Sequence, residues 1–305
     1  MPAPQPNNLP NSIRLHAFAK INLGLKLLAK RPDGYHEIRT IYQTVALHDR
    51  LEISLSDREE GIRFECDDPQ IPGGSRNLVY QACALWRRAT GYRGGVAAQL
   101  EKLIPTGSGL GGASSDAAAT VEGLERLTGS KLTQSRRLAL AARLGSDVPL
   151  FLLGGRVLGC GRGEVVYPLS DLPSRRCLIV FPGFSISTRD AYQQAGLRLT
   201  TQAKPRSIRD VGAWPQFPLL DWGPAENDFE RVAFARWPEL ARLKRQLIRA
   251  GAEIASLTGS GSAVYALFAS ARELLQASKL IPKGWLAFRT RTLPRSDYWR
   301  LLCGR

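Results

Sequence analysis

The sequence feature that most constrains the fold is a glycine-rich loop at residues 105–115, PTGSGLGGASS, which packs four glycines into six positions. The segment before it (96–105) alternates apolar and polar residues, as a half-buried strand does. Beyond the loop, apolar residues recur at helical spacing, and Ser114 or Ser115 can cap the first turn of that helix. A glycine loop that runs into a helix N-terminus presents unpaired backbone N–H groups and the positive end of the helix dipole. The loop therefore predicts a site for an anion, above all a phosphate.

Two familiar nucleotide-binding patterns come close to this loop without fitting it. Gly107, Gly109 and Gly112 spell G-x-G-x-x-G, but a second helix-like stretch, not a strand, follows the first helix. The P-loop pattern fails because Ala113 stands where a lysine is needed, and no protein-kinase motif follows downstream. A plain glycine-rich turn with an ordinary cap is the alternative to a phosphate site. Asp116 is unfavourable beside a bare phosphate, so we expect it to assist the cap or to face a magnesium ion.

A lysine in the middle of an apolar strand is the second unusual feature. Lys20 lies within the segment HAFAKINLGL (16–25), where a lysine is depleted unless it has a partner or faces solvent. Strand alternation predicts two faces, one with Ala17, Ala19, Ile21, Leu23 and Leu25 and the other with His16, Phe18, Lys20 and Asn22.

Polar side chains follow two predicted turns. Tyr35 and His36 are adjacent and follow a Pro-Asp-Gly turn. They either are ordinary residues of a hairpin or contact a ligand. Asp147 follows a predicted amphipathic helix that ends at Gly145, and an apolar strand is expected at Val148–Leu153. This carboxylate either caps a turn or serves as a general base near the glycine loop.

Composition limits the kinds of partner to be expected. The net charge of +15 fits an anionic substrate or an ordinary solvated basic surface. No long basic run or RNA-binding aromatic motif accompanies that charge, and no apolar stretch approaches about 18 residues, so neither nucleic acid nor a membrane is expected as a partner. Five cysteines without a C-x-x-C pair, with only three histidines, predict no zinc cluster and a reducing, cytoplasmic setting.

The length of 305 residues and the order of the predicted elements indicate an α+β fold of two domains. We expect a disordered tail at 1–12, which does not fit a secretory signal, an N-terminal domain at 13–168 and a C-terminal domain at 169–305. The proline-rich segment 199–222 is expected to run over the surface. The active site is expected in the cleft between the two domains.

Several segments, in this order, resemble the GHMP kinase superfamily: AKINLGL with RPDGYHEI, PTGSGLGGASSDAA, LGSDVPLFL, NDFE and SLTGSGSAVYALF. Within it, AKINL and DGYH point to the branch that phosphorylates 4-diphosphocytidyl-2-C-methyl-D-erythritol on its 2-hydroxyl in non-mevalonate isoprenoid biosynthesis. The resemblance implies the GHMP fold, ATP as the phosphoryl donor with Mg²⁺, and no firmly assigned protein ligand for the metal.

The resemblance also implies roles for individual residues. Lys20 and Asp147 would be the catalytic pair. Asn22, Tyr35, His36, Asp147, Thr188 and Tyr192 would bind the substrate, with Tyr35 stacked on the cytosine. ATP would be bound by Asn77 and Lys102 near the nucleoside, and around the phosphates by Pro105, Thr106, Gly107, Ser108, Gly109, Leu110, Gly111, Gly112, Ala113, Ser114 and Ser115. Ala113 and Ser187 replace a glycine and a proline that are usual in the superfamily.

Two alternatives to this function stay open, as does the oligomeric state. The first is another GHMP small-molecule kinase, such as a homoserine or mevalonate kinase. The adjacent Tyr35 and His36 argue against it, because those small substrates offer no base for an aromatic ring to stack on. The second is a nucleotide-binding protein that has lost its chemistry, and the presence of both Lys20 and Asp147 argues against that.

Overall fold

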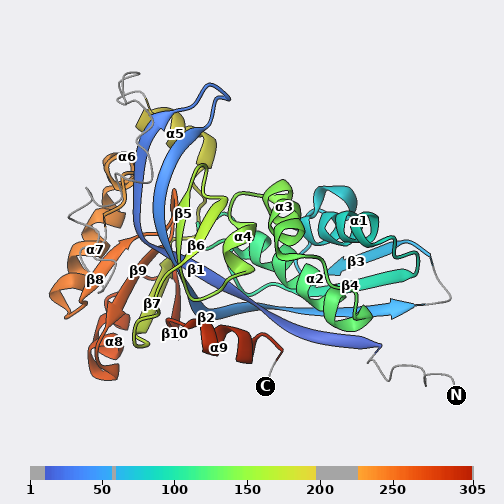
Figure 1. Ribbon diagram of the computed structural model, residues 1–305. Helices are drawn as coiled ribbons and strands as arrows, with labels where there is room; N and C mark the ends of the chain where they lie inside the picture. Colours follow the sequence, from blue (N-terminus) through green and yellow to red (C-terminus); the bar gives the residue numbers. More distant parts are fainter. Residues whose placement is uncertain (1–10, 57–59, 197–225, 304–305) are drawn as a thin grey trace, which may run out of the picture.

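The computed structural model describes residues 11–56, 60–196 and 226–303, which form two sheets flanked by helices (Figure 1). The predicted α+β class is therefore confirmed. Residues 1–10 of the tail predicted at 1–12 lie outside these ranges, whereas Ser12 is already part of a strand. The surface connection predicted at 199–222 also lies outside them. No helix in the described ranges combines the length and the apolar character needed to cross a bilayer.

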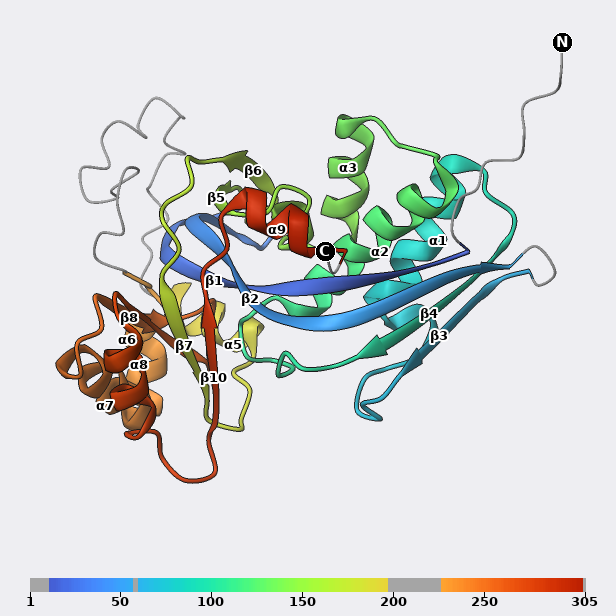
Figure 2. The ribbon, with the colours of Figure 1, turned by 90° about the horizontal axis from the view of Figure 1, so that it is seen from below.

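The larger sheet is organised by one long hairpin, β1 and β2, which runs through the whole molecule (Figure 2). One half of β2 pairs with β4 and the other half pairs with β5, so the strand order is β3-β4-β2-β5-β6, with β1 on β2. The pair β3–β4 is parallel and the other pairs are antiparallel. The six strands are β1 (Ser12–Lys30), β2 (His36–Ser56), β3 (Ile62–Cys66), β4 (Gly95–Glu101), β5 (Arg156–Cys160) and β6 (Val165–Pro168).

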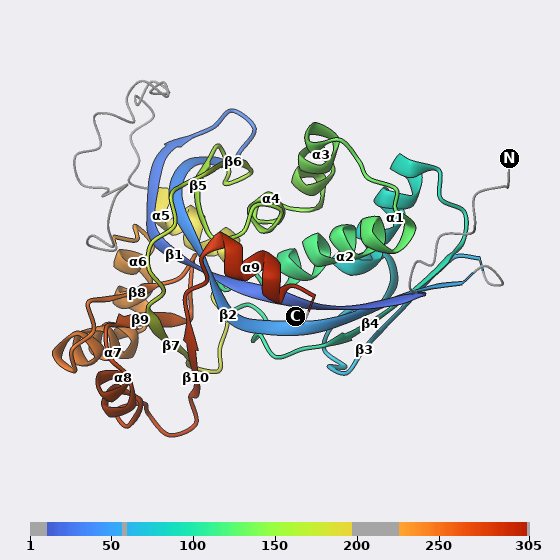
Figure 3. The same cartoon turned by 60° about the horizontal axis from the view of Figure 1, so that its bottom comes forward.

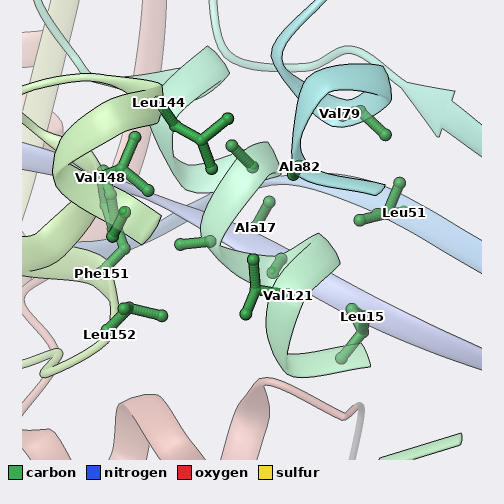
Figure 4. Close-up of a cluster of buried hydrophobic side chains, with 14 of the residues drawn as sticks. Leu15, Ala17, Leu51, Val79, Ala82, Val121, Leu144, Val148, Phe151 and Leu152 are labelled. Carbon is green, nitrogen blue, oxygen red and sulfur yellow. The ribbon is translucent and has the colours of Figure 1, made fainter. Parts of the chain in front are cut away.

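Helices between these strands cover one face of the sheet. They are the 3-10 helix η1 (Gly74–Arg76) and the α-helices α1 (Leu78–Thr90), α2 (Gly112–Thr128), α3 (Gln134–Leu144) and α4 (Val148–Phe151). Their apolar side chains meet those of β1 and β2 in the first hydrophobic core, part of which Figure 4 shows. α2 lies at the centre of this core, with eleven of its residues buried.

The second sheet has the order β10-β7-β9-β8 with all pairs antiparallel, and it has its own core. Its elements are β7 (Arg176–Phe181), α5 (Thr188–Gly196), α6 (Glu230–Arg236), α7 (Pro238–Arg249), β8 (Ile254–Leu257), β9 (Val264–Phe268), α8 (Ala271–Ser278) and β10 (Leu286–Arg291). The far end of the hairpin joins this core through Leu25, Leu27 and Ile38. The hairpin therefore carries side chains into both cores.

The final helix, α9 (Arg295–Leu301), returns to the larger sheet (Figure 3). Tyr298 on it is buried in the first core, and its hydroxyl donates to the Phe151 carbonyl at 2.7 Å. A third apolar cluster, from the middle of the hairpin and the second sheet, joins the two halves. The domain boundary expected near residue 168 stays a prediction.

Two local predictions are wrong. The run after Asp147 forms the short helix α4 rather than a strand, because Pro149 in its first turn has a φ suited to a helix start. Strand alternation also fails at Phe18, where the pairing of β1 with β2 shifts register at a bulge, and Phe18 is buried in the first core together with Ala17. Beyond that bulge, Lys20 and Asn22 do lie on one side of β1, since their side chains are hydrogen-bonded at 2.8 Å.

Candidate active site

The glycine loop connects β4 to α2, as predicted, and it lies against β1. The backbone N–H of Lys20 donates to the Leu110 carbonyl at 2.9 Å, which fixes the loop beside the strand. The N-cap of α2 is Gly111, whose φ of +75° turns the chain into the helix without help from a side chain. The first N–H groups of a helix begun in this way are available to an anion.

The predicted capping by Ser114 or Ser115 is wrong. Both serines lie within the first turn of α2, after the cap, because the left-handed Gly111 already supplies the turn. Ser114 lines the cavity above the loop. The Ser115 hydroxyl is buried and has no hydrogen-bond partner in the described part of the chain.

A second loop, residues 258–262, holds the glycine loop from the side of the second sheet. Gly109 has a φ of +83°, and a Cβ at this position would lie 2.2 Å from the carbonyl oxygen of Thr258. The backbone N–H of Ala263 also donates to the Ser108 carbonyl at 3.1 Å. Glycine is therefore required at position 109 because the backbone of the second loop approaches it closely, whether or not a ligand also does.

Lys20 and Asp147 form an ion pair beside the glycine loop. Nζ of Lys20 is 3.4 Å from Oδ2 of Asp147, and the two side chains are 4% and 31% exposed. A lysine buried to this extent requires a counter-charge, so the pair accounts for the lysine within the apolar strand. The structure brings together the two residues to which the sequence resemblance assigns catalysis.

The Asn22 side chain connects several segments of the protein through hydrogen bonds. Its Oδ1 accepts from Lys20 Nζ at 2.8 Å, from Thr258 Oγ1 at 3.2 Å and from the Gly259 N–H at 2.8 Å. Its Nδ2 donates to Thr40 Oγ1 at 2.7 Å, and the residue is 1% exposed. This amide fixes the Lys20 ammonium and the second loop, and its role as a substrate ligand stays a prediction.

Lys102 lies between the side chains of two buried aspartates, Asp49 and Asp116. Its Nζ donates to both, at 2.9 Å to Oδ2 of Asp116. Asp49 also accepts from the backbone N–H groups of Leu103 and Ile104, at 2.6 and 2.7 Å. Burial raises the pKa of Asp116 to about 8, although Lys102 opposes this shift. The expectation that Asp116 assists the helix cap is wrong, because its side chain is turned to Lys102.

Asn77 caps α1, because its Oδ1 accepts from the Val79 N–H at 2.8 Å. Asn77 and Lys102 nevertheless line the same cavity as the glycine loop. Their predicted place near a nucleoside is thus compatible with the geometry and stays a prediction.

Two hollows meet at Asp147. The glycine loop, Lys20 and Lys102 line a cavity of about 310 Å³, and the tip of the β1–β2 hairpin lines a wider one of about 1120 Å³. The walls of both include Ser114, Asp147, Thr188 and Tyr192. A ligand in either hollow would therefore reach the same carboxylate.

The wider hollow contains the predicted aromatic pair. His36 is stacked on Tyr192, with ring centroids 5.1 Å apart, and its Nε2 is buried without a hydrogen-bond partner among the described residues. Burial, and then the charge of Lys30, lower the pKa of His36, so the ring is neutral near pH 7. Tyr35 is 55% exposed, and the Arg162 guanidinium lies 4.7 Å from its ring centre.

Some residues of the site could not be predicted from the sequence. The Tyr42 hydroxyl donates to Oδ1 of Asp147 at 3.0 Å. This residue was not predicted, because a tyrosine on an apolar strand is typical of the hydrophobic core. Ser260, whose Oγ is 3.1 Å from Oγ1 of Thr188, belongs to the second loop. The glycines at 259 and 261 were a usable signal for that loop, whereas Arg162 carried no signal of its own.

Comparison with protein families matches residues 77–155 to the GHMP kinases N terminal domain and residues 220–279 to the GHMP kinases C terminal domain. The chain is 40% identical to a 4-diphosphocytidyl-2-C-methyl-D-erythritol kinase of Solibacter usitatus, over 94% of this chain and 91% of that protein. It is 38% identical to the protein of that name from a Geobacter species, over 92% of this chain and 99% of that protein.

Solved structures agree with these matches. A crystal structure of 4-(cytidine 5'-diphospho)-2C-methyl-D-erythritol kinase superposes with a TM-score of 0.74 at 33% identity, covering 92% of this chain and 99% of that one. A homoserine kinase from Cytophaga hutchinsonii superposes with a TM-score of 0.67 at 21% identity, over 96% of this chain and 98% of that one, and so shares the fold alone.

Proposed function

The chain belongs to the 4-diphosphocytidyl-2-C-methyl-D-erythritol kinases of the GHMP kinase family, and we propose that it transfers the γ-phosphoryl group of ATP to the 2-hydroxyl of 4-diphosphocytidyl-2-C-methyl-D-erythritol. One observation carries this proposal. The hollow beside the glycine loop and the hollow beside Tyr35 and His36 meet at the ion pair of Lys20 and Asp147. A donor in one and an acceptor in the other would react at that pair.

The donor side fits the triphosphate of ATP. The N-terminus of α2 and the glycine loop offer backbone N–H groups to the phosphates, while Lys20 adds a positive charge at the Asp147 end. Mg²⁺ would reach the site with ATP, because this ion keeps phosphate and water ligands and needs only one or two carboxylates. Asp147, partly exposed in the cavity wall, is a carboxylate of the required kind.

The acceptor side fits a cytidine diphosphate group. Tyr35 exposes its ring to the hollow, so a base can stack on it, and the unpartnered Nε2 of His36 can bond a polar edge of that base. Lys30, Arg162 and Arg189 line the same hollow and supply positive charge for a diphosphate. Mevalonate and homoserine would leave this side of the cleft empty.

The chemistry then requires only positioning and charge. Asp147 accepts the hydrogen bond of the attacking hydroxyl and takes its proton as the bond to phosphorus forms. Lys20 neutralises the charge that builds on the transferred phosphoryl group. We place this reaction in the cytoplasm, since no disulfide joins any of the five cysteines, all of which are described.

An ADP-release assay tests the proposed function. Purified protein with ATP and Mg²⁺ is given 4-diphosphocytidyl-2-C-methyl-D-erythritol, mevalonate or homoserine in parallel. We expect rapid ADP release with the first acceptor only. ADP release that is equal with all three, or faster with mevalonate or homoserine, would contradict the proposal.

A further inference from the structure

We propose that Tyr42 is a positioning residue that sets the orientation of the Asp147 carboxylate for phosphoryl transfer. The inference rests on the proposed function, because it assigns Tyr42 a part in that reaction. Tyr42 lies on β2, where it pairs with Asn22 on one side and with Val157 on the other. It is 1% exposed, yet it is one of the residues that line the cavity beside the glycine loop.

A hydrogen-bond donor and an ammonium contact the two oxygens of Asp147 separately. The Tyr42 hydroxyl donates to Oδ1 at 3.0 Å, and Lys20 Nζ is 3.4 Å from Oδ2. The Asp147 side chain makes no cap bond to α4, so it would otherwise turn freely about its last torsion. With both oxygens engaged from two strands of one hairpin, one plane of the carboxylate is fixed. The lone pairs that remain point in defined directions toward an attacking hydroxyl.

The phenol lies in a slot that two glycines leave open. A Cβ at Gly159 would lie 2.5 Å from a carbon of the Tyr42 ring. A Cβ at Gly163 would lie 2.5 Å from the Tyr42 hydroxyl oxygen and 3.8 Å from Oδ1 of Asp147. Gly159, within β5, therefore leaves room for the ring, and Gly163, in the turn between β5 and β6, leaves room for its hydroxyl. A phenylalanine would fill the slot but leave Oδ1 without this donor.

The hydroxyl can act only as a donor to Asp147. Burial, and then the charge of Asp147, raise the pKa of Tyr42 well above its ordinary value. The phenol therefore keeps its proton at every pH at which the enzyme would work. Lys20 Nζ lies 5.6 Å from the centre of the Tyr42 ring, so the face of the same side chain also contacts the ammonium. Tyr42 thus touches both members of the catalytic pair without reaching the reacting atoms.

The Tyr42→Phe variant tests this role, because it keeps the ring and removes only the hydroxyl. We expect kcat to fall about 10- to 100-fold with the KM for ATP unchanged, since a hydrogen bond to a charged group is lost. A carbon-13 NMR spectrum of the protein without substrate, with the Asp147 carboxyl carbon labelled, should also show that resonance shifted, because Oδ1 has lost its hydrogen-bond donor.

Tyr298→Phe is the matched control. It removes a buried tyrosine hydroxyl that also donates to α4, at the Phe151 carbonyl, but Tyr298 lines neither hollow. This variant should lose thermal stability and keep the parent kcat and the parent Asp147 resonance. A Tyr42→Phe enzyme with the parent kcat and the parent Asp147 resonance would overturn the inference, as would a Tyr298→Phe enzyme with the same loss of kcat and the same shift of that resonance. Inactivity of the parent protein toward the cytidyl substrate would instead contradict the proposed function, and the Asp147 resonance would still decide the role of Tyr42.

Discussion

Because Lys20 and Asp147 form an ion pair, we expect two single variants and their combination to differ in stability. Asp147→Asn leaves the Lys20 ammonium, which is 4% exposed, without its counter-charge. Lys20→Met instead leaves a carboxylate that is 31% exposed and still bonded to Tyr42. At an effective dielectric constant of about 20, two charges 3.4 Å apart attract by about 5 kcal/mol. Solvent at Asp147 screens part of this attraction, so we expect Asp147→Asn to lower the free energy of unfolding by about 1–3 kcal/mol.

The double variant should recover most of that loss. A methionine has nearly the shape of the lysine stem and carries no charge to leave unpaired, so Lys20→Met/Asp147→Asn should melt at a higher temperature than Asp147→Asn alone. Activity should not recover. Each single variant should lower kcat by about 10²- to 10⁴-fold, and the double variant should lose little more, because the two groups act as a unit.

The assays are thermal melts and steady-state ADP release, with all three variants and the parent measured side by side. Calorimetric titration with an ATP analogue that cannot be cleaved controls for nucleotide binding, which should stay near normal in Asp147→Asn. A folded Asp147→Asn enzyme with parent kcat would refute the catalytic assignment. Additive losses of kcat in the double variant, or a double variant less stable than Asp147→Asn, would refute the coupling of the pair.

Three further predictions concern the surroundings of the pair. Tyr35→Ala should weaken binding of the cytidyl substrate by about 1–3 kcal/mol and leave ATP binding unchanged in calorimetry, whereas Tyr167→Ala, an exposed tyrosine of β6, should change neither. Gly109→Ala should melt well below Gly284→Ala and bind ATP more weakly, because both glycines have similar φ, +83° and +85°, but only at 109 does a Cβ meet backbone. The pKa of Asp116 is raised to about 8 in the folded protein. Between about pH 4 and 8 its carboxyl is therefore protonated in the folded protein and ionised in the unfolded chain, so the free energy of unfolding should fall as pH rises through this range. Melts across this range should show a shallower fall for Asp116→Asn, and an equal fall would exclude Asp116 as the cause.

The parts of the site that depend on neighbouring residues in the chain could be predicted from the sequence. Glycine density and the apolar period after it located the loop and α2. The lysine in an apolar strand indicated that Lys20 needed a partner, and Asp147, which follows the end of a helix, is the carboxylate that it meets. Local patterns of this kind depend on a few neighbouring residues, so they can be read without tertiary structure.

What could not be predicted depends on contacts between distant segments. The bulge at Phe18 arises from pairing with β2, which no period within β1 reveals. Tyr42 lies 105 positions from Asp147 along the chain, so its hydrogen bond exists only in the folded hairpin. The clash that requires glycine at 109 likewise involves Thr258, a residue of the other sheet's loop.

The position of the transferred phosphate tests the proposed reaction most directly. The acceptor's C2 carries a methyl group and a hydroxyl but no hydrogen, so a phosphate on that hydroxyl has no proton three bonds from phosphorus. After complete turnover with ATP and Mg²⁺, phosphorus-31 NMR of the product should therefore show one new phosphomonoester signal without such coupling, beside an intact cytidine diphosphate. A proton-coupled phosphomonoester, which places the phosphate on a primary or secondary hydroxyl, or the absence of any new ester, would contradict the assignment of the two hollows to ATP and this acceptor.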